Sequence, residues 1–233
     1  MKLSLLLIIC LLFCTTSSDA NGVIELSNLK DPISEVSERI LTEAYKRIDF
    51  NLKIRKFPAE RALHESNAGN TDGEVNRIQG IHKKYVNLVM VPTPVNYFEG
   101  VVFTKNLIFP INGWDSLRPY KIVMRIGSKF AEKGTKDMDT IKVPTYSMAF
   151  RLLDINRADI CIASRLTGLL QIKKLNLIGV KAIEPPLVKS QLYHYVHKKN
   201  KNIIPKINSS LIKMHEEGLI EKIRAQYIDK ITK

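Results

Sequence analysis

Cysteine is scarce in this chain, and two of its three cysteines, Cys10 and Cys14, stand within the first 14 residues. The rest of the chain holds only Cys161, so it cannot form an internal disulfide, which excludes a small scaffold stapled by such bonds. Cys161 stands in the apolar run ADICIAS, where a buried and inert thiol is expected rather than a nucleophile. The fold must therefore be held by its hydrophobic core.

The sequence patterns of well-known catalytic sites are missing as well. The chain has no GxSxG, HExxH or CxxC motif and no glycine-rich phosphate loop. His194 and His197 are three residues apart in a predicted strand, so they face opposite sides and do not share a metal ion. Ordinary surface or hinge histidines are the expectation. We therefore expect no metal, no cofactor and no catalytic activity.

Long hydrophobic runs are missing too, except at the start of the chain. Lys2 precedes an apolar run from residue 3 to residue 14, and Ser18-Asp19-Ala20 forms a small-x-small cleavage site. The run is shorter than the roughly 20 residues that span a bilayer. Residues 1–20 are therefore predicted to be a secretory signal peptide that delivers the mature chain to the periplasm. No later run approaches transmembrane length, so the mature chain is not expected to be embedded in a membrane.

Acidic residues are outnumbered: 23 Asp and Glu stand against 36 Lys and Arg, for a formal net charge of +13. The cations are scattered along the chain, and only Lys198-Lys199-Asn200-Lys201 forms a short run. Binding of nucleic acid needs a clustered basic face with aromatic platforms, so no nucleic-acid partner is expected. The excess charge leaves three explanations open: an anionic ligand, an anionic surface, or solubility alone.

What the chain does have is an alternation of strand-like and helix-like segments, which is typical of a mostly parallel sheet covered by helices. Strands are predicted at residues 23–26, 52–57, 74–78, 86–91, 101–104, 120–126, 158–163, 178–180 and 192–196. Helices are predicted to open at Pro32 behind an Asp31 cap, at Pro58, at a Thr145 cap and at Thr167. The roughly 213 residues after residue 20 suit two lobes of about 100 residues each, or one larger α/β domain.

The end of the chain carries the most informative pattern. An apolar stripe recurs there at helical spacing, through Ile204, Ile207, Leu211 and Met214. Gly218 then supplies a left-handed helix stop, and a second apolar stripe begins directly after it. A strand, a loop and two amphipathic helices are therefore predicted from residue 192 to residue 227.

Segments along the whole chain after residue 20 occur in the order and spacing of a known family. They are ILTEAYKRI, FPAERALHESNAGNTDGEVNRI, YVNLVMVPTPV, GVVFTKN, RLLDINRADICIAS and the closing stretch just described. In this the chain resembles the bacterial extracellular solute-binding proteins of family 3, the amino-acid type. The resemblance implies a two-lobed type II periplasmic-binding-protein-like α/β fold, with mostly parallel sheets flanked by helices and two hinge strands.

The resemblance also implies a division of the chain and a set of partners. Lobe one would hold residues 21–103 and 196–233 and lobe two residues 104–195, with the chain crossing at residues 101–104 and 193–196. Proteins that look like this are monomers that capture a small molecule by lobe closure. They serve an inner-membrane ABC transporter or an envelope sensor.

Candidate binding residues follow from a rule for open α/β sheets, which bind ligands beyond the carboxyl ends of their strands and at the starts of the following helices. The rule selects polar and cationic side chains from distant segments: Asn28, Arg61 and Arg77 in lobe one, and Ser128, Tyr146, Ser164 and Arg165 in lobe two. A guanidinium suits a carboxylate or a similar planar anion. Plainer alternatives stay open, since Arg61 would also suit an ion pair with Glu60 or Glu65, and Arg165 a solvated rim.

Two departures from the amino-acid-binding pattern concern the ligand. The family's Thr-x-x-Arg segment after the third strand has only Arg77 as an approximate substitute, and Ser164 stands where the family has an aspartate for the ligand ammonium. A buried ammonium without a carboxylate partner is costly, so these departures weaken the expectation of an ordinary α-amino acid. A small polar ligand, anionic or amino-acid-like, is the expectation.

Two other functions stay open beside solute binding. An enzyme of the dehydratase type on the same fold would need a general acid, and Glu25, Glu74 and Glu99 are the nearby carboxylates. Their strand positions give no reason to expect a raised pKa. An interaction module with a vestigial cleft is the third reading, which a cleft filled with apolar side chains would favour.

Overall fold

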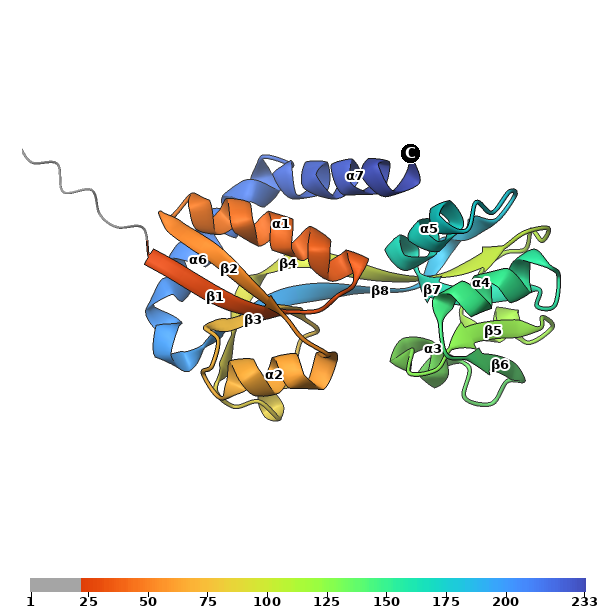
Figure 1. The fold of residues 1–233 in the computed structure, drawn as a ribbon, viewed down its shortest axis with the longest axis horizontal. Coiled ribbons are helices and arrows are strands. Elements are labelled where there is room, and N and C mark those ends of the chain that lie inside the picture. The colour runs from red at the N-terminus through yellow and green to blue at the C-terminus, as the bar shows by residue number, and fades with distance from the viewer. Residues whose placement is uncertain (1–21) are drawn as a thin grey trace, which may run out of the picture.

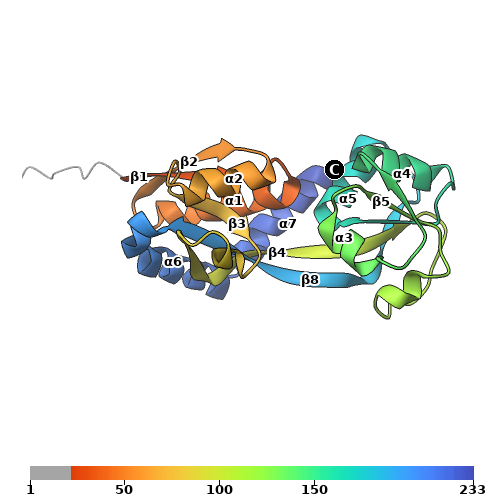
Figure 2. The same cartoon turned by 90° about the horizontal axis from the view of Figure 1, so that it is seen from below.

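The computed structural model describes residues 22–233, which form two α/β halves joined by two long strands (Figure 1). These strands are β4 (Leu88–Thr104) and β8 (Lys181–His197), and they pair antiparallel along the bridge between the halves (Figure 2). The chain leaves the first half along β4 and returns along β8. The predicted signal peptide lies outside the described residues.

Within residues 22–233 the strands form one sheet in the order β2-β1-β3-β8-β4-β7-β5-β6. The other strands are β1 (Gly22–Asn28), β2 (Phe50–Lys56), β3 (Gly73–Arg77), β5 (Ile122–Arg125), β6 (Thr140–Val143) and β7 (Ile160–Ser164). Neighbours within each half are parallel, whereas every pairing that involves β4 or β8 is antiparallel. Two parallel blocks therefore flank an antiparallel hinge.

Helices cover both faces of this sheet. They are α1 (Pro32–Lys46), α2 (Ala59–Asn67), α3 (Lys129–Gly134), α4 (Tyr146–Asp154), α5 (Arg165–Lys174), α6 (Ile204–Glu216) and α7 (Leu219–Thr232), with short 3₁₀ turns at Ile81–Lys83, Trp114–Leu117 and Lys198–Ile203. In the first half α1 and α2 lie on opposite sides of β1 and β3 (Figure 1). None of the helices between residues 22 and 233 combines the length and apolar character needed to cross a bilayer.

Local sequence signals set the ends of several helices, as predicted. Asp31 accepts a hydrogen bond from the Ser34 amide at 2.9 Å and so caps α1, whose first turn contains Pro32. Thr145 caps α4 in the same manner. Gly218 separates α6 from α7 with a φ of 66°, a left-handed conformation that glycine adopts without strain.

Two of the predicted strands turn out to be one. The segments predicted at 86–91 and 101–104 both belong to β4, which continues through Pro92 and Pro94. Its pairing with β8 shifts register on both sides of Pro94. At such irregularities the ladder does not need an amide hydrogen, so proline is tolerated inside the strand.

Three other local expectations need correction. The helix predicted to open at Thr167 begins at Arg165, because the Ser164 side chain accepts from the Thr167 amide and acts as the cap. Residues 178–180 form no strand, since β8 starts at Lys181. The elements α3 and β6 were not expected from the pattern, and both are only a few residues long.

His194 is a core residue, which contradicts the expectation of an ordinary surface or hinge histidine. Its strand is central in the sheet and α1 covers it, so the side chain is fully buried. Its Nδ1 lies 2.8 Å from the Glu74 carbonyl oxygen, which can only accept, so Nδ1 carries the proton. Nε2 then accepts from the Tyr45 hydroxyl at 2.8 Å. Burial lowers the pKa of His194 to about 4, so the ring is neutral.

The chain crosses between the halves earlier than predicted in both hinge strands. On β4, Val95 packs in the core of the first half, whereas Val101 and Phe103 already pack in the second. On β8, Leu187 packs in the second half and Tyr193 in the first. Both strands continue past the crossing without a break, so the pattern of the sequence does not mark the point where the chain changes half.

One residue of the second half is buried in the core of the first. Leu166, in the first turn of α5, is buried in the core of the first half, in one cluster with Ile231 of α7. Leu169 and Leu170 pack against the same cluster. The Lys173 ammonium adds a hydrogen bond to the Lys230 carbonyl at 3.1 Å. Helix α5 therefore belongs to the second half by its place in the chain and contacts the first half through its apolar face.

Candidate functional site

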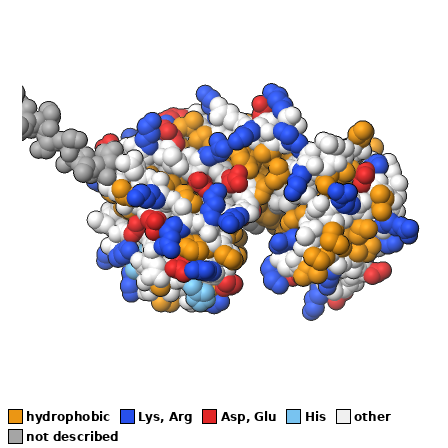
Figure 3. All heavy atoms as spheres, viewed as in Figure 1, with side chains coloured by type: hydrophobic (Ala, Val, Ile, Leu, Met, Phe, Trp, Pro, Cys, Tyr) orange, Lys and Arg blue, Asp and Glu red, His pale blue; other side chains and the backbone are white. Residues whose placement is uncertain are grey.

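The carboxyl ends of strands from both halves meet at one cleft. Strand β7 ends at Ser164, opposite Gly100 in the hinge, and β3 ends at Arg77, opposite Tyr193. Strands β5 and β1 run parallel to these two and end at the same edges. The space-filling view shows a hollow between the halves on the lower side of the molecule (Figure 3). A side chain that binds a ligand between the halves has to lie at the edge of this hollow.

A second hollow lies in the first half, at the opposite end of its strands. It is a groove of about 680 Å³ between the end of α1 and α6, lined by residues such as Arg47, Lys206 and Lys213. A smaller pocket of about 160 Å³ beside Ile24 and Phe50 shares Lys206 with it. Neither hollow contains a predicted site residue, so both lie outside the candidate site.

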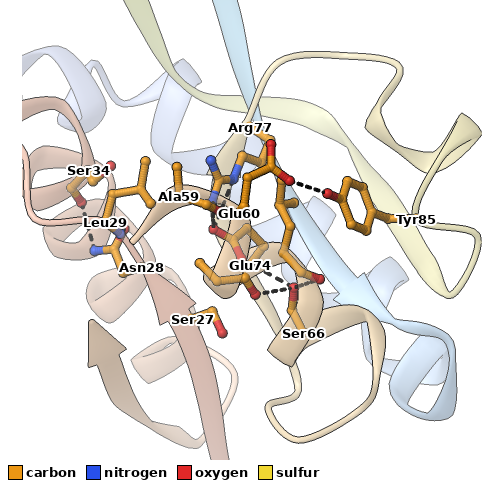
Figure 4. Close-up of polar contacts among 12 residues, drawn as sticks. Ser27, Asn28, Leu29, Ser34, Ala59, Glu60, Ser66, Glu74, Arg77 and Tyr85 are labelled. Carbon is orange, nitrogen blue, oxygen red and sulfur yellow. Dashed lines mark hydrogen bonds and ion pairs between the residues drawn. The ribbon is translucent and has the colours of Figure 1, made fainter. Parts of the chain in front are cut away.

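Arg77 is held by acceptors of the protein itself. Its guanidinium donates two hydrogen bonds to one Glu74 oxygen, at 3.0 and 2.6 Å, and a third to the Ala59 carbonyl at 3.0 Å (Figure 4). Positions i and i+3 of a regular strand face opposite sides, but a register shift between the two residues brings them together. Arg77 is 12 % exposed. The cation stands at the edge of the cleft with its hydrogen-bonding groups already occupied by the protein.

Glu74 has a raised pKa, contrary to the expectation for the carboxylates near the cleft. Burial raises the pKa of its carboxyl to about 7, against the opposing effects of Arg77 and of a hydrogen bond from Ser66. The side chain is only 1 % exposed. A general acid must touch its substrate, and this carboxyl is enclosed by protein. The pKa of Glu74 would suit a proton donor, but its carboxyl is not accessible to a substrate.

Asn28 is buried and organises the turn that follows β1. Its amide nitrogen donates to the Ser34 carbonyl at 3.2 Å and to Glu38 at 3.1 Å, and its amide oxygen accepts from the Leu29 nitrogen at 2.9 Å. Figure 4 shows this group beside the strand end, separate from the Glu74–Arg77 pair. Asn28 thus fixes the entry of α1 at the edge of the cleft.

Arg61 is exposed and weakly held. Its guanidinium lies 5.3 Å from the centre of the Phe57 ring, and its Nε donates to Glu65 at 3.4 Å. Of the two acidic partners considered from the sequence, the one it contacts is Glu65. An exposed pair of this kind contributes little to stability, so the guanidinium is free to turn toward a ligand.

Ser128 and Tyr146 are brought together at the edge of the second half. Ser128 precedes α3 and Tyr146 stands in the first turn of α4, yet the Tyr146 hydroxyl donates to Ser128 Oγ at 3.3 Å. Ser128 is 4 % exposed and the Tyr146 ring is half-buried. Two loops that the sequence keeps apart thereby form one surface.

Ser164 and Arg165 stand where β7 passes into α5, beside the hinge strands. Ser164 caps α5 and donates to the Thr167 hydroxyl at 2.7 Å. Arg165 Nε donates to Glu99 at 2.9 Å, and its two terminal nitrogens donate to Glu184 at 2.6 and 2.9 Å. All the nitrogens of this guanidinium are therefore engaged by carboxylates on β4 and β8. The alternative of a merely solvated rim charge does not describe it.

Glu99 links the hinge to the last helix as well. Arg224 of α7 is 3 % exposed and donates to Glu99 at 3.4 Å and to Asn96 at 2.8 Å. Its guanidinium also lies 3.8 Å from the centre of the Tyr97 ring. A buried charge needs such compensation. Arg224 of α7 and Arg165 of α5 therefore share the Glu99 carboxylate, at the point where β4 passes from one half to the other.

Arg125 is a cleft residue that the sequence analysis did not select. It ends β5 and lies with its guanidinium 5.1 Å from the centre of the Tyr146 ring. The rule of strand carboxyl ends would have found it, because it stands two residues before Gly127 and three before the selected Ser128. Within residues 22–233 no group of three or more His, Cys, Asp or Glu side chains is arranged to hold a metal ion.

Comparison with known sequences gives one relative and no family. No protein-family model matches the chain. A protein of Shewanella oneidensis, described as uncharacterized, is 27 % identical over 205 residues, which cover 82 % of this chain and 75 % of that protein.

Comparison with solved structures defines the class of fold. The L-cystine solute receptor of Neisseria gonorrhoeae, unliganded and open, has a TM-score of 0.70 at 16 % identity, over 89 % of this chain and 93 % of that one. An ancestral arginine-binding protein bound to arginine has a TM-score of 0.66 at 17 % identity, over 89 % and 99 %. A histidine kinase sensor domain with similarity to periplasmic binding proteins has 0.66 at 16 %, over 90 % and 97 %.

These likenesses confirm the predicted fold class. The chain has the two-lobed, periplasmic-binding-protein-like α/β fold, with a mixed sheet, flanking helices and two hinge strands. The three similar structures are described as a receptor, a binding protein and a sensor domain, rather than as enzymes.

Proposed function

We propose that this protein is a solute-binding protein of the extracellular family 3 type, which captures a small polar ligand, anionic or amino-acid-like, between its lobes. One observation carries the proposal: the strand ends of both halves, which hold the polar and cationic candidate residues, border a common open hollow, and the long strands β4 and β8 run from one half to the other (Figures 2 and 3). A ligand that contacts both halves favours the closed arrangement by its extra contacts there.

The two halves contribute different contacts in this proposal. Asn28, Arg61 and Arg77 form the wall of lobe one, and Ser128, Tyr146, Ser164 and Arg165 that of lobe two. Arg61 is the mobile cation of the first wall, since its pairing with Glu65 is exposed. Arg77 and Arg165 shape the walls, because acidic residues already occupy their hydrogen-bonding groups.

The place of work and the partners follow from the same proposal. The segment 1–20 directs export, and the mature chain acts in the periplasm as a monomer. It delivers its ligand to an inner-membrane ABC transporter or reports it to an envelope sensor. Both kinds of role occur among proteins of this fold, as the solute receptor and the kinase sensor domain illustrate.

The proposed function includes no catalysis. A dehydratase-like reaction would need an acid in contact with substrate, and the carboxyl with a suitably raised pKa, Glu74, is enclosed. An interaction module with a filled cleft is the other alternative. The hollow in Figure 3 and the polar residues at its edges support a ligand instead.

Thermal-shift screening against amino acids, organic acids and nucleobases tests the proposal. A ligand at 100 times its Kd raises the free energy of unfolding by about 3 kcal/mol, which raises Tm by about 5–10 °C in a chain of this size. Small-angle X-ray scattering with the best compound should show a smaller radius of gyration, and an inert compound from the same screen serves as control. Stabilisation without compaction would refute lobe closure, and a screen without any hit would refute solute capture.

A further inference from the structure

We propose that Arg125 is the residue that recognises the anionic group of the ligand, and that this group is a carboxylate. The proposal rests on the proposed function, and it assigns to lobe two a recognition role that the sequence analysis gave to Arg77. Arg125 ends β5 at the edge of the cleft and stands on the same surface as Ser128 and Tyr146.

The first argument is the distribution of charge among the arginines at the strand ends. Arg77 is paired with Glu74, and Arg165 with Glu99 and Glu184. Arg125 forms no ion pair with any residue in the described range 22–233. It therefore supplies the uncompensated positive charge at this edge, and an anion is the missing partner.

The second argument is the state of its hydrogen-bonding groups. The Nε of Arg125 is buried and has no acceptor among the described residues, which is costly for a charged donor. The first acid that follows Arg125 in the chain, Glu132 in α3, instead accepts from the Gly127 nitrogen at 2.6 Å and from Lys129 at 3.0 Å. No acceptor among residues 22–233 holds this Nε, so the protein leaves the charge of the guanidinium without an acidic partner there.

The third argument concerns the kind of anion. The Tyr146 ring lies under the Arg125 guanidinium at 5.1 Å, and the hydroxyl of that ring is held by Ser128. A guanidinium stacked on an aromatic ring keeps the edge that bears its two terminal nitrogens free for two parallel hydrogen bonds in its own plane. That geometry fits the two oxygens of a carboxylate. Ser128 Oγ is a further polar group within the same surface.

Isothermal titration calorimetry with matched probes tests this assignment on the mature protein. The probes are organic acids such as succinate, each compared with its uncharged amide, such as succinamide, and with inorganic phosphate. We expect a carboxylate to bind and its amide to bind at least about tenfold more weakly, since charged hydrogen bonds are lost. The substitution Arg125→Gln should weaken binding of the carboxylate by about tenfold or more, and Arg125→Lys by less.

Arg151→Gln is the matched control, because Arg151 is an exposed arginine of α4 in the same lobe. It should bind as the wild type does, and the unliganded Tm of all variants should stay within about 2 °C of the wild type. Full affinity in Arg125→Gln, or binding of phosphate or amides but no carboxylate, would overturn the inference while leaving solute capture intact. Binding of none of the probes or screened compounds would overturn both.

Discussion

Two buried groups that touch the same backbone segment should give this protein opposite pH dependences of stability that nearly cancel. His194 donates to the carbonyl oxygen of Glu74, and the side chain of Glu74 is buried as well. Burial lowers the pKa of His194 from 6.5 to about 4 and raises the pKa of Glu74 from 4.5 to about 7. The stability that neutral His194 provides is complete above pH 6.5 and is lost as pH falls toward 4. The stability that the neutral Glu74 carboxyl provides is complete below pH 4.5 and is lost as pH rises toward 7.

The magnitudes follow from the two differences in pKa. Each is about 2.5 between the folded and unfolded chain, which corresponds to about 3 kcal/mol of stability over the whole range. Near pH 5.5 the unfolded state holds almost one more proton at His194 and almost one fewer at Glu74. Each group therefore contributes a slope of about 1 kcal/mol per pH unit, with opposite signs. Both side chains are buried, so solvent screening reduces neither slope much.

Removing one group should expose the slope of the other. We expect the free energy of unfolding of His194→Gln to fall by about 1 kcal/mol per pH unit more than that of the wild type between pH 4.5 and 6.5. The free energy of unfolding of Glu74→Gln should instead rise, relative to that of the wild type, by about 1 kcal/mol per pH unit over the same range. Urea unfolding followed by circular dichroism measures both slopes, and all other titrating groups are common to the three proteins. Parallel pH profiles in the three proteins would refute the reasoning.

Two further outcomes are expected from the packing of the second half. Gly168→Ala should lower the free energy of unfolding by about 1–3 kcal/mol in urea titrations, because a Cβ at this position overlaps the Phe103 ring and α5 has to shift; an unchanged midpoint would contradict this. The Cys161 thiol is fully buried, which raises its pKa, so with Cys10 and Cys14 replaced by Ser it should react with Ellman's reagent only after denaturation. Rapid labelling of the native protein would show that the strand opens.

The order of elements was predictable because each signal in it is local. The Asp31 cap, the Thr145 cap and the Gly218 stop depend on the backbone of one turn, and all three act as their residue types predict. The continuity of β4 was not predictable, because Pro94 reads as a strand breaker unless the register shift beside it is known. A shift of this kind is set by the partner strand, which the local sequence does not contain.

For the candidate site, the sequence predicts which residues stand at strand ends, and it does not predict which of their side chains are already engaged by the protein. The rule of strand ends places Ser128 and Tyr146 at one edge, and the structure joins them by a hydrogen bond. Whether an arginine can bind a ligand depends on its ion pairs within the protein. Arg165 is paired with Glu99, which is distant in the chain, and a register shift in β3 brings Arg77 to Glu74. His194 likewise becomes buried only because α1 crosses its strand.

The place of Leu166 has a consequence for how this protein unfolds. A helix that lobe two contributes inserts this leucine into the core of lobe one, so neither lobe can melt alone without exposing apolar surface that belongs to both. This contact is therefore expected to couple the unfolding of the two lobes. In the proposed lobe closure this contact has to be kept or replaced, because separating α5 from the core of lobe one would expose Leu166 to water.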